Sequence, residues 1–398
     1  MSLPPPLVTA GLTRSLLATP AGRGAVATVL VSGPDALRAV ATSFAAAGGQ
    51  PLGDCPFDRV VFGRWLGDGF AEDVVVCRRG EERIELHCHG GQAAVSNVLG
   101  TLAQAGCLPQ AWQDWLVTGR HVPIEVQARI ALAHASTRRT AAILLDQLRG
   151  AFRDAADGVV AQVRAGQTAA AARRLQELLH LGPLGTHLTR PWSVVLAGPP
   201  NSGKSSLVNA LLGYPRAIVF DQPGTTRDVL STVAALDGWP VELCDTAGLH
   251  ASIDPLEVAG MARAQRQLKS ADLVLLVADA SQPWTAELDS LVQQWPEALL
   301  VHSHGDLVTG PLDDRPTGLV TSIVTAAGLD RLMGAIVERL VPRPPPAGAA
   351  VPFTTAQLHQ LERAATALAR SDSAAAIAAL EPLLVPARAE ISQDLTAP

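Results

Sequence analysis

The sequence predicts a multidomain protein in which an α+β domain comes first and an α-helical domain is interrupted by an inserted α/β domain. Two observations lead to this fold class. Between residues 191 and 342, apolar runs such as "WSVVLAG" and "ADLVLLVADA" alternate with helical stretches, which is typical of a parallel sheet with helices on both faces. Helical periodicity, with apolar residues three and four apart, occurs both before and after that block.

The composition indicates a folded chain rather than a disordered one. Of the 398 residues, 48% are hydrophobic and 17% are charged, and the formal net charge of −6 argues against generally basic nucleic-acid binding, although a local basic groove is compatible with it. The five cysteines form no CxxC pair, no signal-peptide layout occurs, and no apolar run reaches the about 18 residues that a membrane span needs. We therefore expect a cytoplasmic protein with reduced thiols and no membrane contact.

The first 117 residues are predicted to form the α+β domain. "AVATVLVSG" over residues 25–33 indicates a strand, "PDALRAVATSFAAA" over residues 34–47 a helix, and "RIELHCHGG" over residues 83–91 a second strand that ends in glycines.

The helical domain is predicted in two parts, over residues 118–190 and 343–398. A turn-rich stretch, "GPLGTHLTRP", ends the first part, and the proline-rich linker "VPRPPPAGAAVP" precedes the second. We expect the two parts to pack together, so that the α/β block over residues 191–342 is an insertion between them.

A phosphate-binding motif opens the α/β block. "GPPNSGKSS" fits GxxxxGK[ST], follows an apolar strand and precedes a helical pattern. In this arrangement glycines let backbone N–H groups face the phosphates, the helix N-terminus adds positive potential, Lys204 reaches the β- and γ-phosphates, and Ser205 offers its hydroxyl to Mg²⁺. The residues expected to contact the nucleotide here are Gly198, Asn201, Ser202, Gly203, Lys204, Ser205 and Ser206.

Two further motifs narrow the prediction to a GTPase. In "DTAG", Asp245 ends the next core strand and can hold Mg²⁺ through water, and the Gly248 amide can face the γ-phosphate. "DQPGTTRD" lies between the motifs and carries paired threonines, Thr225 and Thr226, one of which can complete the Mg²⁺ shell. "GPPNSGKSS" and "DTAG" alone would admit an ATPase. With "DQPGTTRD" between them, the three motifs predict a Ras-like P-loop GTPase domain.

The base-reading motif is unusual. Guanine readers of such domains are usually N/T-K-x-D, and here "SHGD" places Ser303 and His304 before Gly305 and Asp306. Asp306 can still accept hydrogen bonds from guanine N1–H and N2–H, and "TSI", with Ser322 at its centre, occupies the place of the last loop, where a backbone N–H contacts guanine O6. We expect a preference for guanine with weakened affinity.

The sequence pattern "PNSGKSSLVNAL…DQPGTTRD…DTAGL" resembles that of the bacterial tRNA-modification GTPase family called MnmE or TrmE. "ATPAGRGAVATVLVSGPDAL", the "HGG" segment "AEDVVVCRRGEERIELHCHGGQAAV" and "AHASTRRTAAILLDQLRGAF" are similar to other parts of that family, so the resemblance runs from about Ala18 to about Arg363. It implies an N-terminal folate-binding domain that dimerises, a helical domain split by the G domain, and GTP hydrolysis coupled to wobble-uridine (U34) modification of tRNA with a flavoprotein partner, MnmG.

The resemblance also assigns residue roles. The family uses K⁺ in place of an arginine finger, and Asn201 and Thr225 match its K⁺-binding positions. Thr226 matches the second Mg²⁺ ligand beside Ser205, and Glu257 matches the catalytic glutamate that orients the attacking water, while Lys204 stabilises developing charge. At the folate-like site, Glu85 is retained and Arg120 stands where the family has Lys. The resemblance further implies a homodimer that forms through the N-terminal and G domains.

Departures from the family pattern leave alternatives. Leu30 stands where the family has Arg, and the sequence reads "ISQDLTAP" where the family has a Cys-x-Gly-Lys tail, with no cysteine after Cys244. One hypothesis is a K⁺-assisted GTPase that takes part in tRNA modification; another is a divergent paralogue that binds GTP and dimerises as a regulator. A ribosome-assembly GTPase is disfavoured by the N-terminal segments and the split helices.

Overall fold

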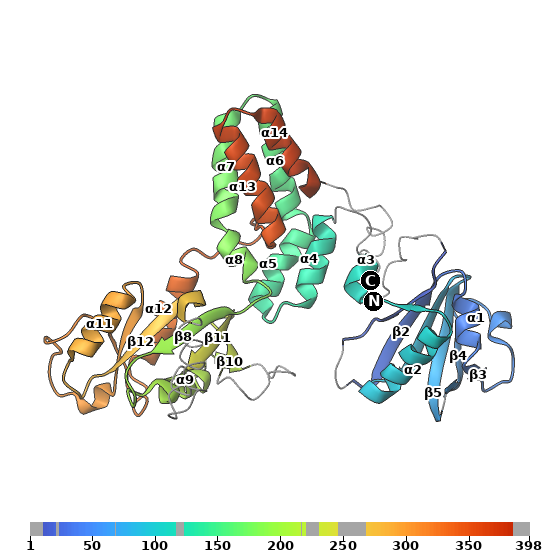
Figure 1. The fold of residues 1–398 in the computed structure, drawn as a ribbon, viewed down its shortest axis with the longest axis horizontal. Helices are drawn as coiled ribbons and strands as arrows, with labels where there is room; N and C mark the ends of the chain where they lie inside the picture. Colours follow the sequence, from blue (N-terminus) through green and yellow to red (C-terminus); the bar gives the residue numbers. More distant parts are fainter. Residues whose placement is uncertain are drawn as a thin grey trace, which may run out of the picture. The chain divides into compact units, whose positions relative to one another are not determined.

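The computed structural model describes residues 11–20, 24–67, 69–116, 123–215, 217–219, 231–245 and 268–384 (Figure 1). The described residues form two compact units, the first up to Val126 and the second from Gln127 to Leu384. Among these described residues, no helix is long and apolar enough to cross a membrane.

A seven-stranded sheet with the order β3-β4-β5-β6-β2-β1-β7 forms the first unit. Its pairs are antiparallel except for β1 with β7. The strands are β1 (Arg14–Leu17), β2 (Val26–Ser32), β3 (Phe44–Ala46), β4 (Val60–Gly67), β5 (Phe70–Gly80), β6 (Arg83–His89) and β7 (Leu108–Pro109), and the helices are α1 (Ala36–Ala41), η1 (Leu52–Asp54), α2 (Gln92–Gln104) and α3 (Trp112–Leu116).

One face of this sheet is covered by α1 and α2 (Figure 1). Successive side chains of a strand point to opposite faces of the sheet, and the two helices cover only one of these faces. Buried and exposed residues therefore alternate along β4. Trp65 of β4 is fully buried, and its indole Nε1 donates a 2.9 Å hydrogen bond to Thr101 Oγ1 of α2, which fixes the helix on the sheet.

The helix predicted over residues 34–47 is wrong in its second half. The helix α1 ends at Ala41, and Phe44–Ala46 form the edge strand β3. Phe44 lies opposite Trp65 in the register and is buried with it in the core, so tertiary packing overrides the helical propensity of the alanines that follow.

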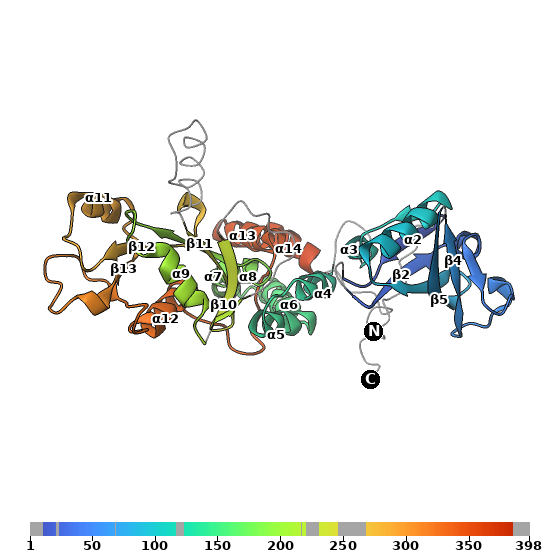
Figure 2. The same ribbon diagram turned by 90° about the horizontal axis from the view of Figure 1, so that it is seen from below.

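The second unit contains a helical part drawn from two separate stretches of sequence. Its helices are α4 (Ile124–Ala133, which begins in the first unit), α5 (Arg138–Leu148), α6 (Ala151–Arg164), α7 (Thr168–His180), α8 (Gly182–Thr186), α13 (Thr355–Ala369), α14 (Ser373–Leu380) and η4 (Glu381–Leu383). Helix α13 packs against α7 and α14 against α6, as Figures 1 and 2 both show. Residues far apart in sequence thus share one helical core.

A buried glutamine ties these stretches together. Gln147 of α5 is fully buried, its Nε2 donates to the Ala349 carbonyl at 3.0 Å, and its Oε1 accepts from Val351 N–H at 3.1 Å. Because a buried amide must find partners, this residue specifies where the proline-rich segment passes. Capping boxes at Thr137 and Thr354 fix the starts of α5 and α13.

We expect Gly185→Ala to destabilise the helical part by about 3 kcal/mol, at the upper end of what overpacking usually costs. A Cβ at Gly185 of α8 would lie 1.7 Å from the Pro352 carbonyl oxygen, which is backbone and cannot yield without moving the segment before α13. Calorimetric thermal unfolding checks this. The matched control is Gly334→Ala in the helix α12 (Leu329–Leu340), where nothing lies within 4 Å of an added Cβ, and a gain of up to about 1 kcal/mol is expected there. Equal melting temperatures for both variants would contradict this close packing.

The α/β part of the second unit is a seven-stranded sheet with the order β14-β13-β12-β8-β11-β10-β9. Five neighbouring strands, β14 to β11 in that order, are parallel, which confirms the predicted parallel sheet, and β10 and β9 extend it as antiparallel strands. The strands are β8 (Trp192–Ala197), β9 (Ala217–Val219), β10 (Ser231–Leu236), β11 (Trp239–Asp245), β12 (Leu273–Asp279), β13 (Leu299–Ser303) and β14 (Leu319–Val320).

Helices cover both faces of this sheet, with α11 on one side and α9 and α12 on the other (Figure 2). These helices are α9 (Lys204–Leu212), α11 (Ala286–Gln294) and α12 (Leu329–Leu340). The central strands β8 and β12 are buried along nearly their whole length as a result. Their carboxyl ends point to one edge of the sheet, which is where open α/β sheets bind ligands.

Candidate nucleotide-binding site

The phosphate-binding loop joins β8 to α9, as its motif predicts. Gly198 begins the loop with a φ of +143°, and a Cβ there would lie 2.1 Å from the Val277 carbonyl oxygen of β12, so only glycine fits. Gly203 ends the loop at a φ of +85° and is the N-cap of α9. Two glycines therefore allow the backbone to turn sharply between a buried strand and a helix N-terminus.

Lys204 is held inside this loop. Its side chain is 3% exposed, and its Nζ donates to the carbonyl oxygens of Gly198 at 3.0 Å and Pro199 at 2.7 Å. Burial lowers the pKa of Lys204, and the nearby Asp245 carboxylate opposes that shift. A buried cation at the N-terminus of a helix is suited to bind phosphate.

Next to the lysine, the Ser205 hydroxyl donates a hydrogen bond to the Asp245 carboxylate. Asp245 is the last residue of β11 and lies opposite Leu196 of β8 in the parallel register, so the sheet brings the two motifs together. A hydroxyl and a carboxylate in contact are oxygen ligands of the kind that Mg²⁺ prefers. The two residues fit the predicted Mg²⁺ site.

The other predicted phosphate-loop residues differ in their surroundings. Asn201 is exposed and has a left-handed backbone with a φ of 61°. Ser202 is 3% exposed, and its buried hydroxyl has no hydrogen-bond partner in the described part of the chain. Ser206 is exposed on α9.

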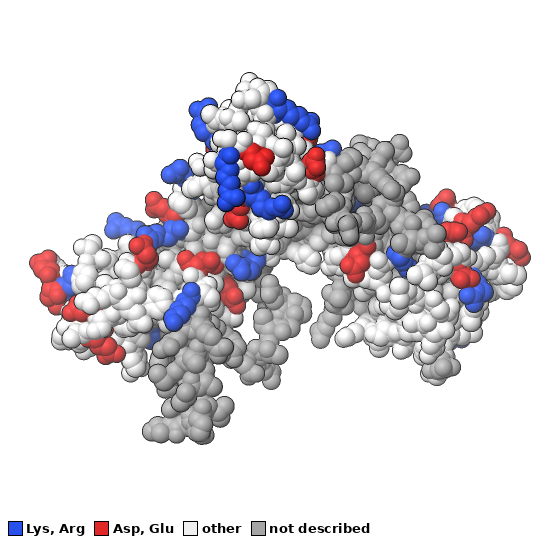
Figure 3. Space-filling view, turned by 45° about the horizontal axis from the view of Figure 1, so that its top comes forward, with Lys and Arg blue, Asp and Glu red and all other residues white. Residues whose placement is uncertain are grey.

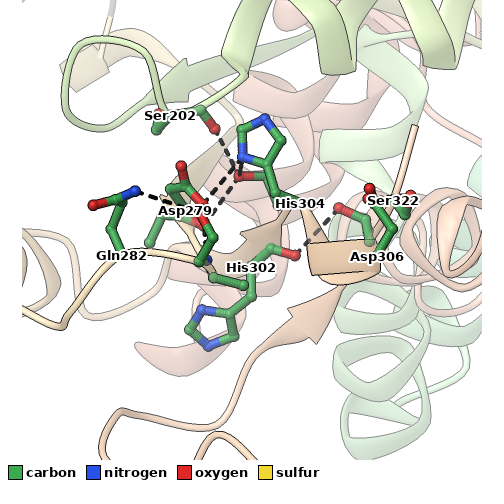
Figure 4. Close-up of polar contacts among 12 residues, drawn as sticks. Ser202, Asp279, Gln282, His302, His304, Asp306 and Ser322 are labelled. Atoms are coloured by element: carbon green, nitrogen blue, oxygen red, sulfur yellow. Dashed lines mark hydrogen bonds and ion pairs between the residues drawn. The ribbon is translucent and has the colours of Figure 1, made fainter. Parts of the chain in front are cut away.

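The base-reading segment follows β13 and continues into the 3₁₀-helix η3 (Gly305–Leu307). Asp306 is exposed, and the Ser322 hydroxyl donates a 2.5 Å hydrogen bond to its Oδ1 (Figure 4). The sequence predicts a backbone contact to guanine at Ser322, and the structure adds that its side chain orients the base-reading carboxylate.

Asp279 was not predicted at this edge, and Ser303 and His304 were predicted only as departures from the base-reading motif. Asp279 at the end of β12 lies beside Ser303 in the parallel register, and its Oδ1 is 3.1 Å from His304 Nδ1. The Ser303 hydroxyl donates to the Ser202 carbonyl oxygen at 2.7 Å, which links the base-reading segment to the phosphate loop (Figure 4). The apolar run that ends at Asp279 was the only sequence signal for that residue.

Several predicted site residues lie outside the described residues, namely Thr225, Thr226, Gly248 and Glu257, together with Arg120 of the folate-like site. In the first unit, Glu85 of β6 is 6% exposed, and its carboxylate accepts a 2.8 Å hydrogen bond from Arg79 Nε. This ion pair spans the β5–β6 hairpin and was missed because its two residues are separated by the turn. The folate-like site stays a prediction.

Two family models match separate regions of the chain. The family model described as "50S ribosome-binding GTPase" matches residues 193–303, and the one described as "GTP-binding protein TrmE N-terminus" matches residues 15–111. Among solved structures, the G domain of the T. maritima FeoB iron transporter aligns with 38% of this chain and 99% of that chain, at 31% identity and a TM-score of 0.28.

Curated relatives match over most of the chain. The tRNA modification GTPase MnmE of Synechococcus sp. (strain CC9605) is 33% identical over 402 residues, covering 89% of this chain and 87% of the relative. The protein of the same name from Symbiobacterium thermophilum is 35% identical over 324 residues, covering 72% and 71%. With the P-loop GTPase site in place, this extent of identity shows that the chain belongs to the MnmE family of GTPases.

Proposed function

We propose that this protein hydrolyses GTP with the help of Mg²⁺ and K⁺, and that hydrolysis serves the modification of the wobble uridine (U34) of tRNA. The observation that carries the proposal is the cluster formed by buried Lys204, exposed Ser205 and buried Asp245 at the carboxyl ends of β8 and β11. Phosphoryl transfer needs positioning and charge neutralisation more than covalent chemistry, and this cluster supplies both.

Mg²⁺ would be held by the Ser205 hydroxyl and Thr226, with Asp245 contributing through water. Bound there, the ion would supply positive charge that offsets the charge developing on the transferred phosphate. Lys204 donates hydrogen bonds to the β- and γ-phosphates from inside the loop. The backbone N–H groups of residues 201–205 donate hydrogen bonds that hold the phosphates at the N-terminus of α9.

K⁺ would be bound by Asn201 and Thr225. The place of Asn201 in the phosphate loop supports this assignment, because its exposed side-chain amide carries an oxygen that can act as a ligand. A cation at this position would replace the positive charge of an arginine finger and stabilise the transition state.

Glu257 would orient the attacking water. We expect Glu257→Ala to leave GTP affinity unchanged and to lower the rate of turnover by about 10²-fold or more, the loss typical of a positioned catalytic group. Single-turnover hydrolysis measures the rate, and fluorescent GTP-analogue binding measures the affinity. Glu287→Ala, at an exposed carboxylate in the first turn of α11, is the control and should hydrolyse GTP at the wild-type rate. An unchanged rate for Glu257→Ala would contradict the role of that glutamate.

The domain arrangement of the proposal follows the family. An N-terminal domain over residues 1–117 dimerises and holds a folate derivative near Glu85 and Arg120, and the G domain over residues 191–342 interrupts a helical domain formed by residues 118–190 and 343–398. The packing of α13 on α7 supports the interrupted helical domain. Three exposed apolar residues on one face of β4, Val60, Phe62 and Leu66, with Arg64 between the last two, support self-association of the first unit.

Charge distribution supports a nucleic-acid partner. The chain as a whole is acidic, yet residues 127–190 carry nine arginines against four acidic residues. Figure 3 shows these basic side chains over the helical part of the molecule. A basic region on an acidic protein is typical of one that meets phosphate groups locally.

Nucleoside mass spectrometry of total tRNA tests the tRNA role. The gene is deleted in its host and complemented with wild-type protein or with Lys204→Ala. Loss of 5-substituted wobble uridines on deletion, restored only by the wild type, is the expected result. Unchanged nucleosides after deletion would contradict the tRNA role and favour the regulatory paralogue. That result would not contradict the proposal that the protein binds GTP.

A further inference from the structure

Within the second unit, the helical part contacts the α/β part at the turn between β10 and β11. Arg139 lies in the first turn of α5, and its Nη1 donates a 3.2 Å hydrogen bond to Asp237 Oδ2 in that turn. The guanidinium carbon lies 5.3 Å from the centre of the Trp239 ring, which is within the range of a cation–π contact. A Cβ added at Gly238 would lie 3.4 Å from Arg139 Cβ, so the helix and the turn are in close contact.

Both sides of this contact are held in place by their own structure. The capping box between Thr137 and Thr140 fixes the start of α5. In the turn, the φ angles are 47° at Asp237 and 78° at Gly238, and two positive values are what a two-residue turn of type I′ requires. Trp239 is 2% exposed and begins β11. Arg139 therefore contacts a part of the hairpin that cannot shift without the strands that follow it.

The other end of the hairpin leads into the nucleotide site. Strand β11 ends at Asp245 of the proposed Mg²⁺ site, and β10 begins at Ser231, five residues after Thr226. Among the described residues, β9 pairs with Ala234–Leu236 of β10, and the first three residues of β10 pair with β11 alone. The hairpin thus connects both proposed Mg²⁺-binding segments to the turn that Arg139 contacts.

We propose that Arg139 is a positioning residue for Mg²⁺-dependent nucleotide binding, because its contact holds the β10–β11 hairpin where the Mg²⁺ site needs it. This inference rests on the proposed GTP site and goes beyond it by giving the helical part a role there. Mg²⁺ with nucleotide acts on one end of the hairpin, α5 contacts the other end, and both favour the same position of the two strands. The two contacts are therefore coupled, and the coupling is reciprocal.

The contact is suited to bias the hairpin rather than to lock it. The side chains of Arg139 and Asp237 are 42% and 66% exposed, and an exposed ion pair contributes little by itself. The ring of Trp239 adds a second attraction to the same guanidinium. A hairpin that leaves this position for part of the time binds Mg²⁺ with nucleotide more weakly, in proportion to the population that is lost. We expect loss of the contact to lower this affinity by about threefold to fivefold, at the low end of typical couplings.

The test is the affinity for a fluorescent, non-hydrolysable GTP analogue over a range of Mg²⁺ concentrations. At saturating Mg²⁺, Arg139→Ala should bind about threefold to fivefold more weakly than the wild type. The difference should disappear as Mg²⁺ is lowered, because the nucleotide then binds through the phosphate loop without using Asp245. The matched control is Arg138→Ala, which removes an exposed arginine from the same turn of α5 and should match the wild type at every Mg²⁺ concentration.

A disulfide gives the converse test within one polypeptide. The 3.4 Å between the Cβ positions of residues 139 and 238 is close to the separation of about 3.5 to 4.5 Å in a disulfide, and the five native cysteines are buried. The double variant Arg139→Cys, Gly238→Cys is measured at saturating Mg²⁺. When oxidised, it should bind the analogue at least as tightly as the wild type. When reduced, it should bind as weakly as Arg139→Ala.

The outcomes separate this inference from the GTP site itself. Equal affinities of Arg139→Ala and wild type at saturating Mg²⁺ would overturn the inference, and so would a loss of the same size at every Mg²⁺ concentration. Equal affinities of the oxidised and reduced double variant would also contradict it. Absence of analogue binding by the wild type would instead contradict the proposed function. Melting temperatures confirm that each variant is folded, and Arg139→Ala decides the question if the double variant forms no disulfide.

Discussion

Lys204→Ala is expected to lower the affinity for GTP by about 10³-fold, which abolishes measurable binding at micromolar protein concentration. The Lys204 ammonium is buried in the phosphate loop and would give two charge-assisted hydrogen bonds to phosphate oxygens. At about 2 kcal/mol each, these bonds amount to about 4 kcal/mol, or about 10³-fold. Isothermal titration with a non-hydrolysable GTP analogue measures the loss.

The chain provides a matched control, since it contains a single other lysine, Lys269, which is exposed. Lys269→Ala removes the same charge from the same protein, and it should bind GTP like the wild type. Near-normal binding by Lys204→Ala would mean that the loop does not hold phosphate, and would contradict the assignment of the whole site.

Asp306→Ala is expected to lower GTP affinity by about 10² to 10³-fold and to abolish the preference for guanine. The carboxylate would accept from both N1–H and N2–H of guanine, and each hydrogen bond to a charged group contributes about 1.5 to 3 kcal/mol. Competition of GTP, ITP and ATP against a fluorescent nucleotide separates the two effects. ITP lacks the N2 amino group, so wild-type protein should prefer GTP over ITP, and the variant should not.

Two further substitutions refine this prediction. Asp313→Ala removes an exposed carboxylate from the same domain and should leave both affinity and selectivity unchanged. Ser322→Ala removes the 2.5 Å hydrogen bond to Asp306 Oδ1, and should lower GTP affinity by about 5-fold, the effect of one ordinary hydrogen bond. Selectivity for GTP over ATP that survives in Asp306→Ala would show that another group reads the base.

The phosphate loop could be predicted from sequence because its chemistry is contiguous. Gly198, Gly203, Lys204 and Ser205 lie within eight positions, and the strand and helix that flank them carry clear apolar patterns. The parallel sheet was predictable for the same reason, since each strand is a short apolar run. Local signals of this kind need no knowledge of which strands are neighbours.

The contacts at the base edge could not be predicted in this way. Asp279 meets His304 because β12 and β13 are adjacent in register, and Ser322 meets Asp306 because the next connection returns to β13. Strand order and register bring these residues together, and neither can be predicted from a single sequence. The same limit explains the error over residues 34–47, where pairing with Trp65 turns an alanine-rich segment into an edge strand.

The central claim is tested most directly by GTP turnover of the purified protein in KCl and in NaCl at equal ionic strength, with Mg²⁺ present and ATP as the control nucleotide. The account predicts turnover of GTP in KCl, far slower turnover in NaCl, and none of ATP in either salt, because K⁺ beside Asn201 neutralises the transition state and Asp306 selects guanine. Equal GTP turnover in the two salts would contradict the role of K⁺, and hydrolysis of ATP at the rate of GTP would contradict the assignment of the base-reading site.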